Sequence, residues 1–139
     1  MKMGFGASAM DEQKADIVLV VEDDEASSAI IDRLLNQMGF SKVLLAENGN
    51  VALNKLYLNQ VSIVISDWRM PDMDGLEFYK RAKKEELLGD VPFLMVTAEN
   101  QKDRITQALK AGVNDYILKP VDLQILREKI EKLLNLKSS

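Results

Sequence analysis

The 139-residue sequence contains neither cysteine nor histidine. The lack of cysteine excludes disulfide bonds, thiol nucleophiles and thiolate metal sites. The lack of histidine excludes imidazole general bases, the usual zinc sites and a phosphohistidine on this chain. If the protein carries phosphate, we expect a carboxylate to accept it from a donor on another molecule.

Long apolar runs are also missing. None approaches the roughly 18–20 residues of a membrane span, and residues 1–16 lack the apolar centre of a signal peptide. The net charge of −4 argues against a general binder of nucleic acids or anionic membranes. We therefore expect a cytoplasmic protein without membrane insertion or direct nucleic-acid contact.

The length predicts one domain with a substantial core. We expect residues 16–139 to form that domain. Residues 1–15, with Gly4, Gly6 and Ser8, are expected to be a disordered lead-in, either native or left by protein expression. Because the last predicted helix ends near the C-terminus, we expect either a stand-alone protein or one domain cut from a longer protein.

Five short apolar segments predict strands that are buried on both faces of a sheet. They alternate with five segments whose apolar residues recur at helical spacing. This alternation predicts an α/β fold, a doubly wound (βα)5 parallel sheet of five strands in the flavodoxin-like order 2-1-3-4-5. The expected strands are 17–21, 43–46, 62–66, 91–96 and 115–118; the expected helices are 26–38, 51–58, 74–84, 100–110 and a last one from 122 through at least 134.

Several side-chain placements follow from the same patterns. Tyr57 and Leu109 are expected to face inward, because they continue the apolar spacing of their helices. Caps are expected at four helix starts, where Asp or Asn can accept a backbone N–H. The expected caps are Asp24, Asn50, Asp122 and Asp74, the last in a capping box with Glu77.

Four of the five predicted strands end on distinctive polar residues: Glu22 and Asp23, Asp67, Thr97 and Lys119. Because parallel strands end at one edge of the sheet, these side chains are expected to meet there. In the order 2-1-3-4-5, the first and third strands are neighbours at the topological switch point. Glu22, Asp23 and Asp67 should therefore form an acidic cluster.

An acidic cluster of this kind favours a divalent cation, because adjacent carboxylates otherwise repel one another and take up protons. Oxygen ligands without histidine or cysteine select Mg²⁺, Mn²⁺ or Ca²⁺. We expect Mg²⁺, with Mn²⁺ as the alternative, because Mg²⁺ keeps part of its water shell beside two or three carboxylates. The backbone carbonyl of Arg69 could supply a further ligand.

Lys119 and Thr97 each have an ordinary structural explanation, an ion pair for Lys119 and a turn hydrogen bond for Thr97. Together with a metal, they favour phosphoryl chemistry. Lys119 and the cation would neutralise the transferring group, Thr97 would donate a hydrogen bond, and Asp67 would attack in line. We therefore predict that Asp67 accepts a phosphoryl group and forms an acyl phosphate.

Four stretches at the predicted strand ends resemble the receiver domain of two-component response regulators, the CheY-like family. They are VVEDD at 20–24, SDWRMPDMDG at 66–75, MVTAE at 95–99 and KP at 119–120. The resemblance extends over residues 16–136, and several segments are most similar to single-domain chemotaxis response regulators. It implies a phosphorylation-controlled binding switch with slow autodephosphorylation rather than an enzyme that turns over an external substrate.

The resemblance also implies roles for individual residues. Asp67 would take the phosphoryl group from the phosphohistidine of a histidine kinase or phosphotransfer protein, or from small phosphodonors. Mg²⁺ would be bound by Asp23, Asp67 and the Arg69 carbonyl, with Glu22 acting through water. Lys119 would contact the phosphoryl group.

In the implied switch, Thr97 moves toward the phosphoryl group and Tyr116 turns inward; the alternative for Tyr116 is a partly buried strand aromatic. The peptide bond before Pro120 would be cis. An output protein would bind the face formed by the fourth predicted helix, the fifth strand and the fifth helix. We expect a monomer, and phosphorylation-dependent dimerisation through this face is left open. Residues expected on the face are Lys102, Arg104, Tyr116 and Ile117.

Arg69 and Glu99 stand two residues past Asp67 and Thr97, respectively, and should flank the site. We hypothesise that they pair across it, hinder attack by water and so slow dephosphorylation. The alternative is a solvated Arg69 whose backbone alone matters, because surface ion pairs contribute little.

Two other functions fit part of the pattern. An aspartyl-phosphate hydrolase of the haloacid dehalogenase type also uses an Asp nucleophile and Mg²⁺. Such enzymes have a second Asp two residues on, where this chain has Arg69. A degenerate receiver that only mediates protein contacts is disfavoured by the intact acid pair, Thr97 and Lys119.

Overall fold

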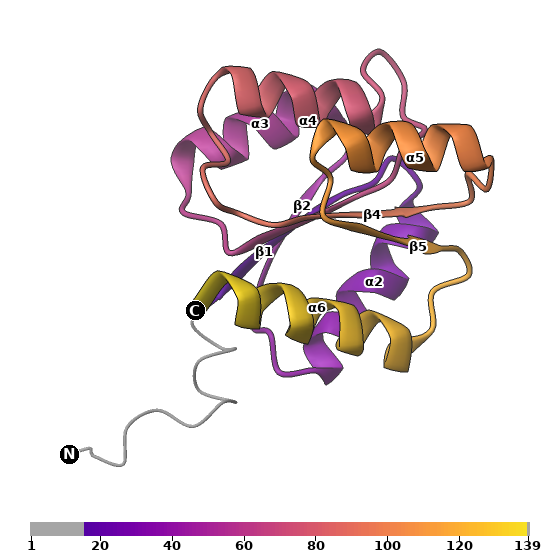
Figure 1. Ribbon diagram of the computed structural model, residues 1–139. Coiled ribbons are helices and arrows are strands. Elements are labelled where there is room, and N and C mark those ends of the chain that lie inside the picture. The colour runs from indigo at the N-terminus through magenta and orange to yellow at the C-terminus, as the bar shows by residue number, and fades with distance from the viewer. Residues whose placement is uncertain (1–15, 139) are drawn as a thin grey trace.

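Strands and helices alternate along the chain in the computed structural model, which describes residues 16–138 (Figure 1). All strand pairs are parallel, and the sheet order is β2-β1-β3-β4-β5. The predicted doubly wound topology is therefore confirmed. The strands are β1 (Ile17–Val21), β2 (Lys42–Ala46), β3 (Ile63–Ser66), β4 (Phe93–Thr97) and β5 (Asp115–Leu118); the helices are α2 (Glu25–Gln37), α3 (Gly49–Leu58), α4 (Gly75–Lys84), α5 (Lys102–Ala111) and α6 (Leu123–Ser138).

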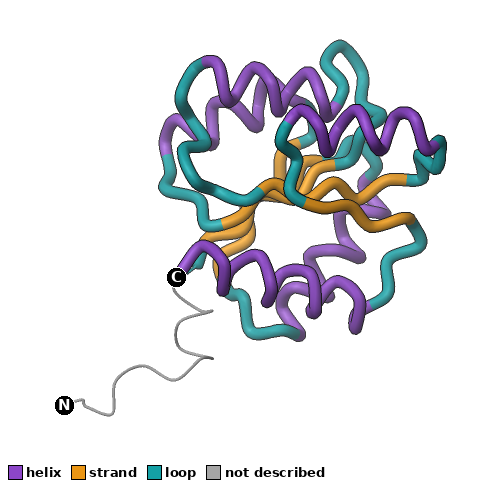
Figure 2. The backbone as a smooth tube through the Cα atoms, in the orientation of Figure 1, coloured by secondary structure: helices purple, strands orange, loops and turns teal. Residues whose placement is uncertain are grey.

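Helices cover both faces of the sheet, with α3, α4 and α5 on one face and α2 and α6 on the other (Figures 1 and 2). Successive strand residues point to opposite faces. In β1, Leu19 and Val21 join one apolar core, whereas Val18 and Val20 join the other. Burial on both faces explains the continuous apolar runs of the strands. None of the helices in the described part of the chain is long and apolar enough to cross a bilayer.

One of the predicted helix caps is wrong. Helix α3 is capped by Asn48, whose side-chain oxygen accepts the Val51 N–H at 2.9 Å. Asn50 lies inside the first turn of the helix and is exposed. The sequence Asn-Gly-Asn offers two equivalent caps, and the helix begins after the first. The predicted caps Asp24, Asp122 and Asp74, the last with Glu77 in a capping box, are confirmed.

Two side chains predicted to face inward are exposed instead. Tyr57 is 76% exposed and Leu109 is 41% exposed, although both follow the apolar spacing of their helices. Leu56 and Ala108, one residue earlier in each case, are the buried ones. Near a helix end, the flanking position of an apolar stripe has no neighbouring layer to cover it, and periodicity alone does not reveal this.

Two strands begin later than predicted. Strand β3 begins at Ile63: the Ser62 N–H still donates to the Ile17 carbonyl at 2.8 Å, but the Ile17 N–H donates to the Ser62 hydroxyl at 3.3 Å rather than to a backbone carbonyl. Strand β4 begins at Phe93, because the Val91 N–H turns back to the Leu88 carbonyl. Neither shift moves the carboxyl ends of these strands.

The capping assignment predicts different outcomes for two asparagines of the same helix. Asn48→Ala should lower the free energy of unfolding by about 1 kcal/mol, because it removes the acceptor for the Val51 N–H. Asn50→Ala should leave stability unchanged or raise it slightly, because alanine favours a helix interior. Urea denaturation measures both variants. A larger loss for Asn50→Ala than for Asn48→Ala would contradict the assignment.

Candidate functional site

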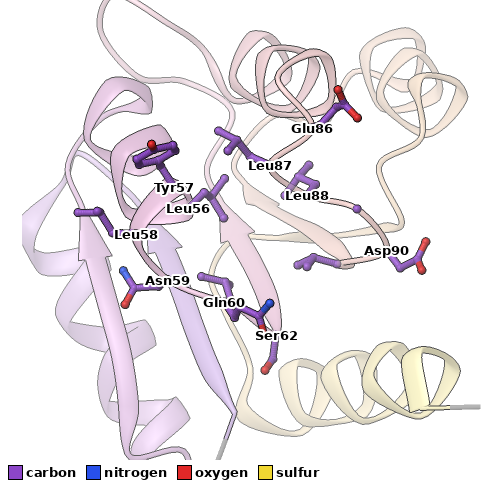
Figure 3. A pocket seen from close by; sticks show the side chains of 13 residues that line it. Leu56, Tyr57, Leu58, Asn59, Gln60, Ser62, Glu86, Leu87, Leu88 and Asp90 are labelled. Atoms are coloured by element: carbon purple, nitrogen blue, oxygen red, sulfur yellow. The ribbon is translucent and has the colours of Figure 1, made fainter.

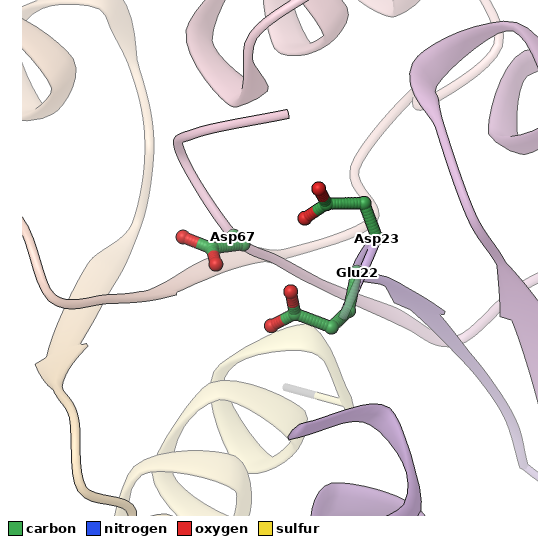
Figure 4. Close-up of side chains that lie close together, drawn as sticks. All are labelled: Glu22, Asp23 and Asp67. Atoms are coloured by element: carbon green, nitrogen blue, oxygen red, sulfur yellow. The ribbon is translucent and has the colours of Figure 1, made fainter. Parts of the chain in front are cut away.

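Glu22, Asp23 and Asp67 lie together at the carboxyl edge of the sheet (Figure 4). Glu22 and Asp23 follow β1, Asp67 follows β3, and these two strands are neighbours. One carboxylate oxygen from each residue lies within 4.8 Å of the other two. Glu22 and Asp67 are 5% and 9% exposed, whereas Asp23 is exposed. The strand order thus brings the three predicted carboxylates into one cluster with one member facing solvent.

Backbone hydrogen bonds that continue the sheet hold the site residues in position. The Glu22 N–H donates to the last carbonyl of β2, and the Asp67 N–H donates to the Val21 carbonyl, both at 2.9 Å. At the neighbouring strand ends, the Lys119 N–H donates to the Thr97 carbonyl at 2.9 Å. The strand register therefore fixes the backbone positions from which the Glu22, Asp67 and Lys119 side chains extend.

The loop after Asp67 is tightly folded around that residue. The Asp67 carboxylate accepts the backbone N–H of buried Trp68 at 2.6 Å, and the Ser66 hydroxyl donates to the Asp67 carbonyl at 2.8 Å. The Gly75 N–H donates to the Trp68 carbonyl at 2.7 Å. A Cβ at Gly75 would collide with the Asp67 carbonyl oxygen, so this close return of the chain requires glycine.

Lys119 links the two buried carboxylates. Its ammonium group lies 2.6 Å from Glu22 Oε1 and 2.8 Å from Asp67 Oδ2. The side chain extends from the end of β5, two strands away from Asp67 in the sheet. One cation therefore balances two neighbouring carboxylates, and the third carboxylate, Asp23, is left to solvent or to a further cation.

The electrostatics of this group follow from burial and from the Lys119 contacts. Burial raises the pKa of the Glu22 carboxyl above its ordinary value, and the hydrogen bonds from Lys119 and the Asp24 N–H offset only part of this effect. Burial lowers the pKa of Lys119, but the hydrogen bonds to Asp67 and Glu22 outweigh it, so the pKa is raised. Lys119 is accordingly a stable cation at neutral pH.

The donor set of the acidic cluster fits a hard divalent cation. Its three side chains offer carboxylate oxygens, which Mg²⁺, Mn²⁺ and Ca²⁺ prefer in proteins. The exposed Asp23 leaves an entry from solvent, and it leaves room for the water molecules that Mg²⁺ retains. The cluster could therefore hold such an ion without any rearrangement of the strands.

Thr97 and Tyr116, the predicted switch pair, lie on neighbouring strands. Thr97 is buried at the end of β4, and its hydroxyl oxygen accepts the Glu99 N–H at 3.1 Å, so the hydroxyl hydrogen remains available to donate. Tyr116 is half-buried on β5, with the Lys129 ammonium 6.0 Å from its ring centroid. The peptide bond between Lys119 and Pro120 is cis, as the resemblance implies.

Arg69 and Glu99 form an ion pair, as predicted. Arg69 Nη2 lies 3.2 Å from Glu99 Oε1, and the guanidinium is exposed while the carboxylate is 2% exposed. Burial raises the pKa of Glu99, but hydrogen bonds from the Gln101 N–H and from Arg69, together with the charge of Arg104, outweigh it and lower the pKa. Glu99 is therefore an ionised carboxylate at the border of the site.

The contact between Arg104 and Glu99 was not predicted from the sequence. Arg104 Nη1, on the first turn of α5, lies 3.8 Å from the same Glu99 oxygen that Arg69 contacts. From the sequence, Arg104 was expected only on the output face. A five-residue separation across a strand-to-helix loop gives no periodic signal, and the contact depends on the fold of residues 98–101.

A separate hollow of about 630 Å³ opens at the opposite edge of the sheet (Figure 3). It lies between the end of α3, with Tyr57 and Leu58, and the segment with Glu86 and Asp90. Its residues precede β3 and β4 in the chain, so it faces away from the carboxylates. The acidic cluster, and not this hollow, is the candidate site for chemistry.

Comparison with known proteins identifies the family. Residues 18–131 match the model of the response regulator receiver domain. A chemotaxis protein CheY homolog of Campylobacter jejuni is 44% identical over 118 residues, which are 84% of this chain and 91% of that protein. Chemotaxis protein CheY of Pseudomonas aeruginosa is 40% identical over 116 residues, 84% of this chain and 94% of that protein. This chain therefore belongs to the CheY-like receiver domains of two-component response regulators.

Solved structures agree with this assignment. Vibrio cholerae chemotaxis protein CheY4 superposes with a TM-score of 0.79 at 29% identity, covering 86% of this chain and 98% of that chain. A putative response regulator from Chloroflexus aurantiacus gives a TM-score of 0.81 at 30% identity, over 86% of this chain and 98% of that chain.

The shared Lys119 contact predicts a specific loss of stability. Lys119→Met should lower the free energy of unfolding at neutral pH by about 2 kcal/mol, less than the roughly 3–5 kcal/mol of a fully buried pair. It leaves two adjacent carboxylates uncompensated. A carboxyl group whose pKa is raised by folding costs stability above its unfolded pKa, so the difference from the unsubstituted protein should shrink as the pH falls and Glu22 takes up a proton.

Urea denaturation at several pH values without divalent cations measures this effect. Lys129→Met is the matched control, because Lys129 pairs with Asp115 at 2.9 Å on a more exposed part of the fold. It should cost less than about 1 kcal/mol. Equal losses in the two variants would show that Lys119 is an ordinary surface ion pair.

Proposed function

We propose that the protein is a phosphorylation-controlled binding switch in which Asp67 accepts the phosphoryl group. The observation that carries the proposal is the arrangement around Asp67, a nearly buried carboxylate that lies beside the carboxylates of Glu22 and Asp23 and is joined to Glu22 through the Lys119 ammonium. Membership of the receiver family supports it. The donor is a phosphohistidine on a histidine kinase or phosphotransfer protein, or a small phosphodonor, because this chain has no histidine.

Asp23, Asp67 and the Arg69 backbone carbonyl would hold Mg²⁺, with Glu22 acting through water. The proposal rests on the oxygen-only donor set and on the solvent access that Asp23 provides. When bound, the cation neutralises negative charge on the phosphoryl oxygens.

In the transfer step, a carboxylate oxygen of Asp67 forms a bond to phosphorus while the bond from phosphorus to the donor's imidazole nitrogen breaks. Lys119, already 2.8 Å from Asp67, stabilises the negative charge of the transferring group, and the Thr97 hydroxyl donates a hydrogen bond to it. The product is an acyl phosphate on Asp67. Its hydrolysis releases inorganic phosphate and regenerates the carboxylate, so the chemistry is self-directed and no external substrate is turned over.

The surface beside Lys119 is suited to a docking donor protein. A hollow of about 470 Å³ is lined by Ile30, Ile31 and Val121 together with Lys119, and it is more apolar than polar. Ile30 is 49% exposed, although it lies on the apolar side of α2. A donor protein must reach Asp67 from outside, and an apolar surface that shares Lys119 with the site would hold it in reach.

The output of the switch is the face formed by α5, β5 and α6. Phosphorylation would draw Thr97 toward the phosphoryl group and let Tyr116 turn inward, which shifts an existing equilibrium between two conformations of this face. Apolar side chains exposed on each of the three elements support a partner surface there. They are Leu109, Leu118 and Ile125, whereas Ile117, which the sequence predicted on this face, is buried in the core. We propose a cytoplasmic signalling role, and the names of the relatives make chemotaxis the first pathway to test.

Trp68 is a natural reporter for the proposed reaction, because it is the single tryptophan, it follows Asp67 directly, and its backbone N–H donates to the Asp67 carboxylate. Its fluorescence should change on addition of Mg²⁺ and change again on addition of acetyl phosphate. Asp67→Asn should abolish the second response. Asp103→Asn, which removes an exposed carboxylate from α5, should preserve both. A full acetyl phosphate response in Asp67→Asn would exclude Asp67 as the acceptor.

We further propose that Arg69 and Glu99 set the lifetime of the acyl phosphate. The exposed Arg69 guanidinium, two residues past Asp67, pairs with Glu99, two residues past Thr97, and a guanidinium held there would hinder the approach of water to the phosphoryl group. Arg69→Ala should therefore speed dephosphorylation severalfold, measured as loss of radiolabelled phosphate from the protein. An unchanged half-life would mean that only the Arg69 backbone matters.

A further inference from the structure

Glu99 is held by cations from two different elements. Its Oε1 atom lies 3.2 Å from Arg69, in the loop after Asp67, and 3.8 Å from Arg104, on the first turn of α5. The first contact is a hydrogen bond and the second is a longer ion pair. The other oxygen, Oε2, accepts the Gln101 N–H at 3.2 Å. A single buried carboxylate thus joins the site loop to the start of a helix on the proposed output face.

The two arginine side chains are exposed to solvent, whereas the carboxylate is buried. The side chains of Arg69 and Arg104 are 75% and 49% exposed, and that of Glu99 is 2% exposed. The Glu99 N–H also donates to the Thr97 hydroxyl, which fixes the backbone beside the carboxylate. Any exchange of partners would therefore occur by movement of an arginine and not of Glu99.

Phosphorylation would place a stronger anion within reach of Arg69. A phosphoryl group carries about −1.5 to −2 charges and three acceptor oxygens, and guanidinium binds phosphate oxygens in a bidentate manner. Arg69 follows Asp67 by two residues. Removal of its guanidinium from Glu99 would leave a buried carboxylate with one backbone donor, which is costly unless another cation replaces it. Arg104 is already in place to do so.

We propose that Arg104 is a positioning residue: on phosphorylation it becomes the ion-pair partner of Glu99, and Arg69 is then free to bind the phosphoryl group on Asp67. The inference rests on the proposed function and adds to it a residue outside the site. Without phosphate, Glu99 is shared by both arginines. With phosphate, Arg69 contacts the phosphoryl oxygens and Arg104 closes on Glu99, which ties the first turn of α5 to the loop of residues 98–101.

A double-mutant cycle tests this exchange, because each arginine should matter only in the presence of the other. The probe is beryllium fluoride, a phosphoryl mimic, titrated with Mg²⁺ present and followed by Trp68 fluorescence. Arg104→Ala should weaken the apparent affinity about twofold to fivefold, the range expected for an exposed ion pair. In the Arg69→Ala background, the same substitution should not change the affinity, because Glu99 then pairs with Arg104 alone whether or not the phosphoryl mimic is bound.

Three further variants make the result specific. Arg104→Lys keeps a cation and should restore most of the affinity. Arg81→Ala is the matched control, because it removes the 2.7 Å surface pair with Glu85, and it should change nothing. Equal effects of Arg104→Ala in both backgrounds, or no effect in either, would overturn the exchange. Asp67→Asn separates the two claims. If beryllium fluoride changes the fluorescence of the unsubstituted protein but not that of Asp67→Asn, and the cycle shows no coupling, only the proposed exchange fails. If Asp67→Asn responds like the unsubstituted protein, both the exchange and the proposed function fail.

Discussion

The bridge from Lys119 to Glu22 and Asp67 is the interaction on which the site depends. Two nearly buried carboxylates lie side by side, and the ammonium at 2.6 Å and 2.8 Å supplies the positive charge that balances them. Its pKa is raised by the same contacts. A charged Asp67 is required for both proposed roles, as a ligand for a cation and as a nucleophile toward phosphorus.

The fold produces this bridge from strand order alone. β1 and β3 are adjacent although β2 separates them in the chain, so the residues that follow them meet at the switch point of the sheet. Ladder hydrogen bonds continue one residue past each strand and fix the backbones of Glu22, Asp67 and Lys119. The base of the site is thus held by the sheet, while its border consists of the exposed side chains of Arg69 and Arg104 around buried Glu99.

The strands and the carboxyl edge could be predicted from the sequence, because buried apolar runs that end on Asp67, Thr97 or Lys119 are local signals. The side chains at helix borders could not. Tyr57 and Leu109 fit the helical period but lie where no layer covers them. Asn48 and Asn50 stand on either side of Gly49 and are chemically equivalent candidates for the cap, so the sequence does not show which of them the helix uses. The Arg104 contact depends on a loop conformation that no spacing encodes.

Asp67 is proposed to become an acyl phosphate, and every other role in the site depends on this step. The most direct test is intact-protein mass spectrometry after incubation with acetyl phosphate and Mg²⁺, followed by treatment with hydroxylamine, which cleaves acyl phosphates. We expect the added mass of one phosphoryl group, its removal by hydroxylamine and no addition to Asp67→Asn. A phosphoryl group that survives hydroxylamine, or one that also appears on Asp67→Asn, would contradict it.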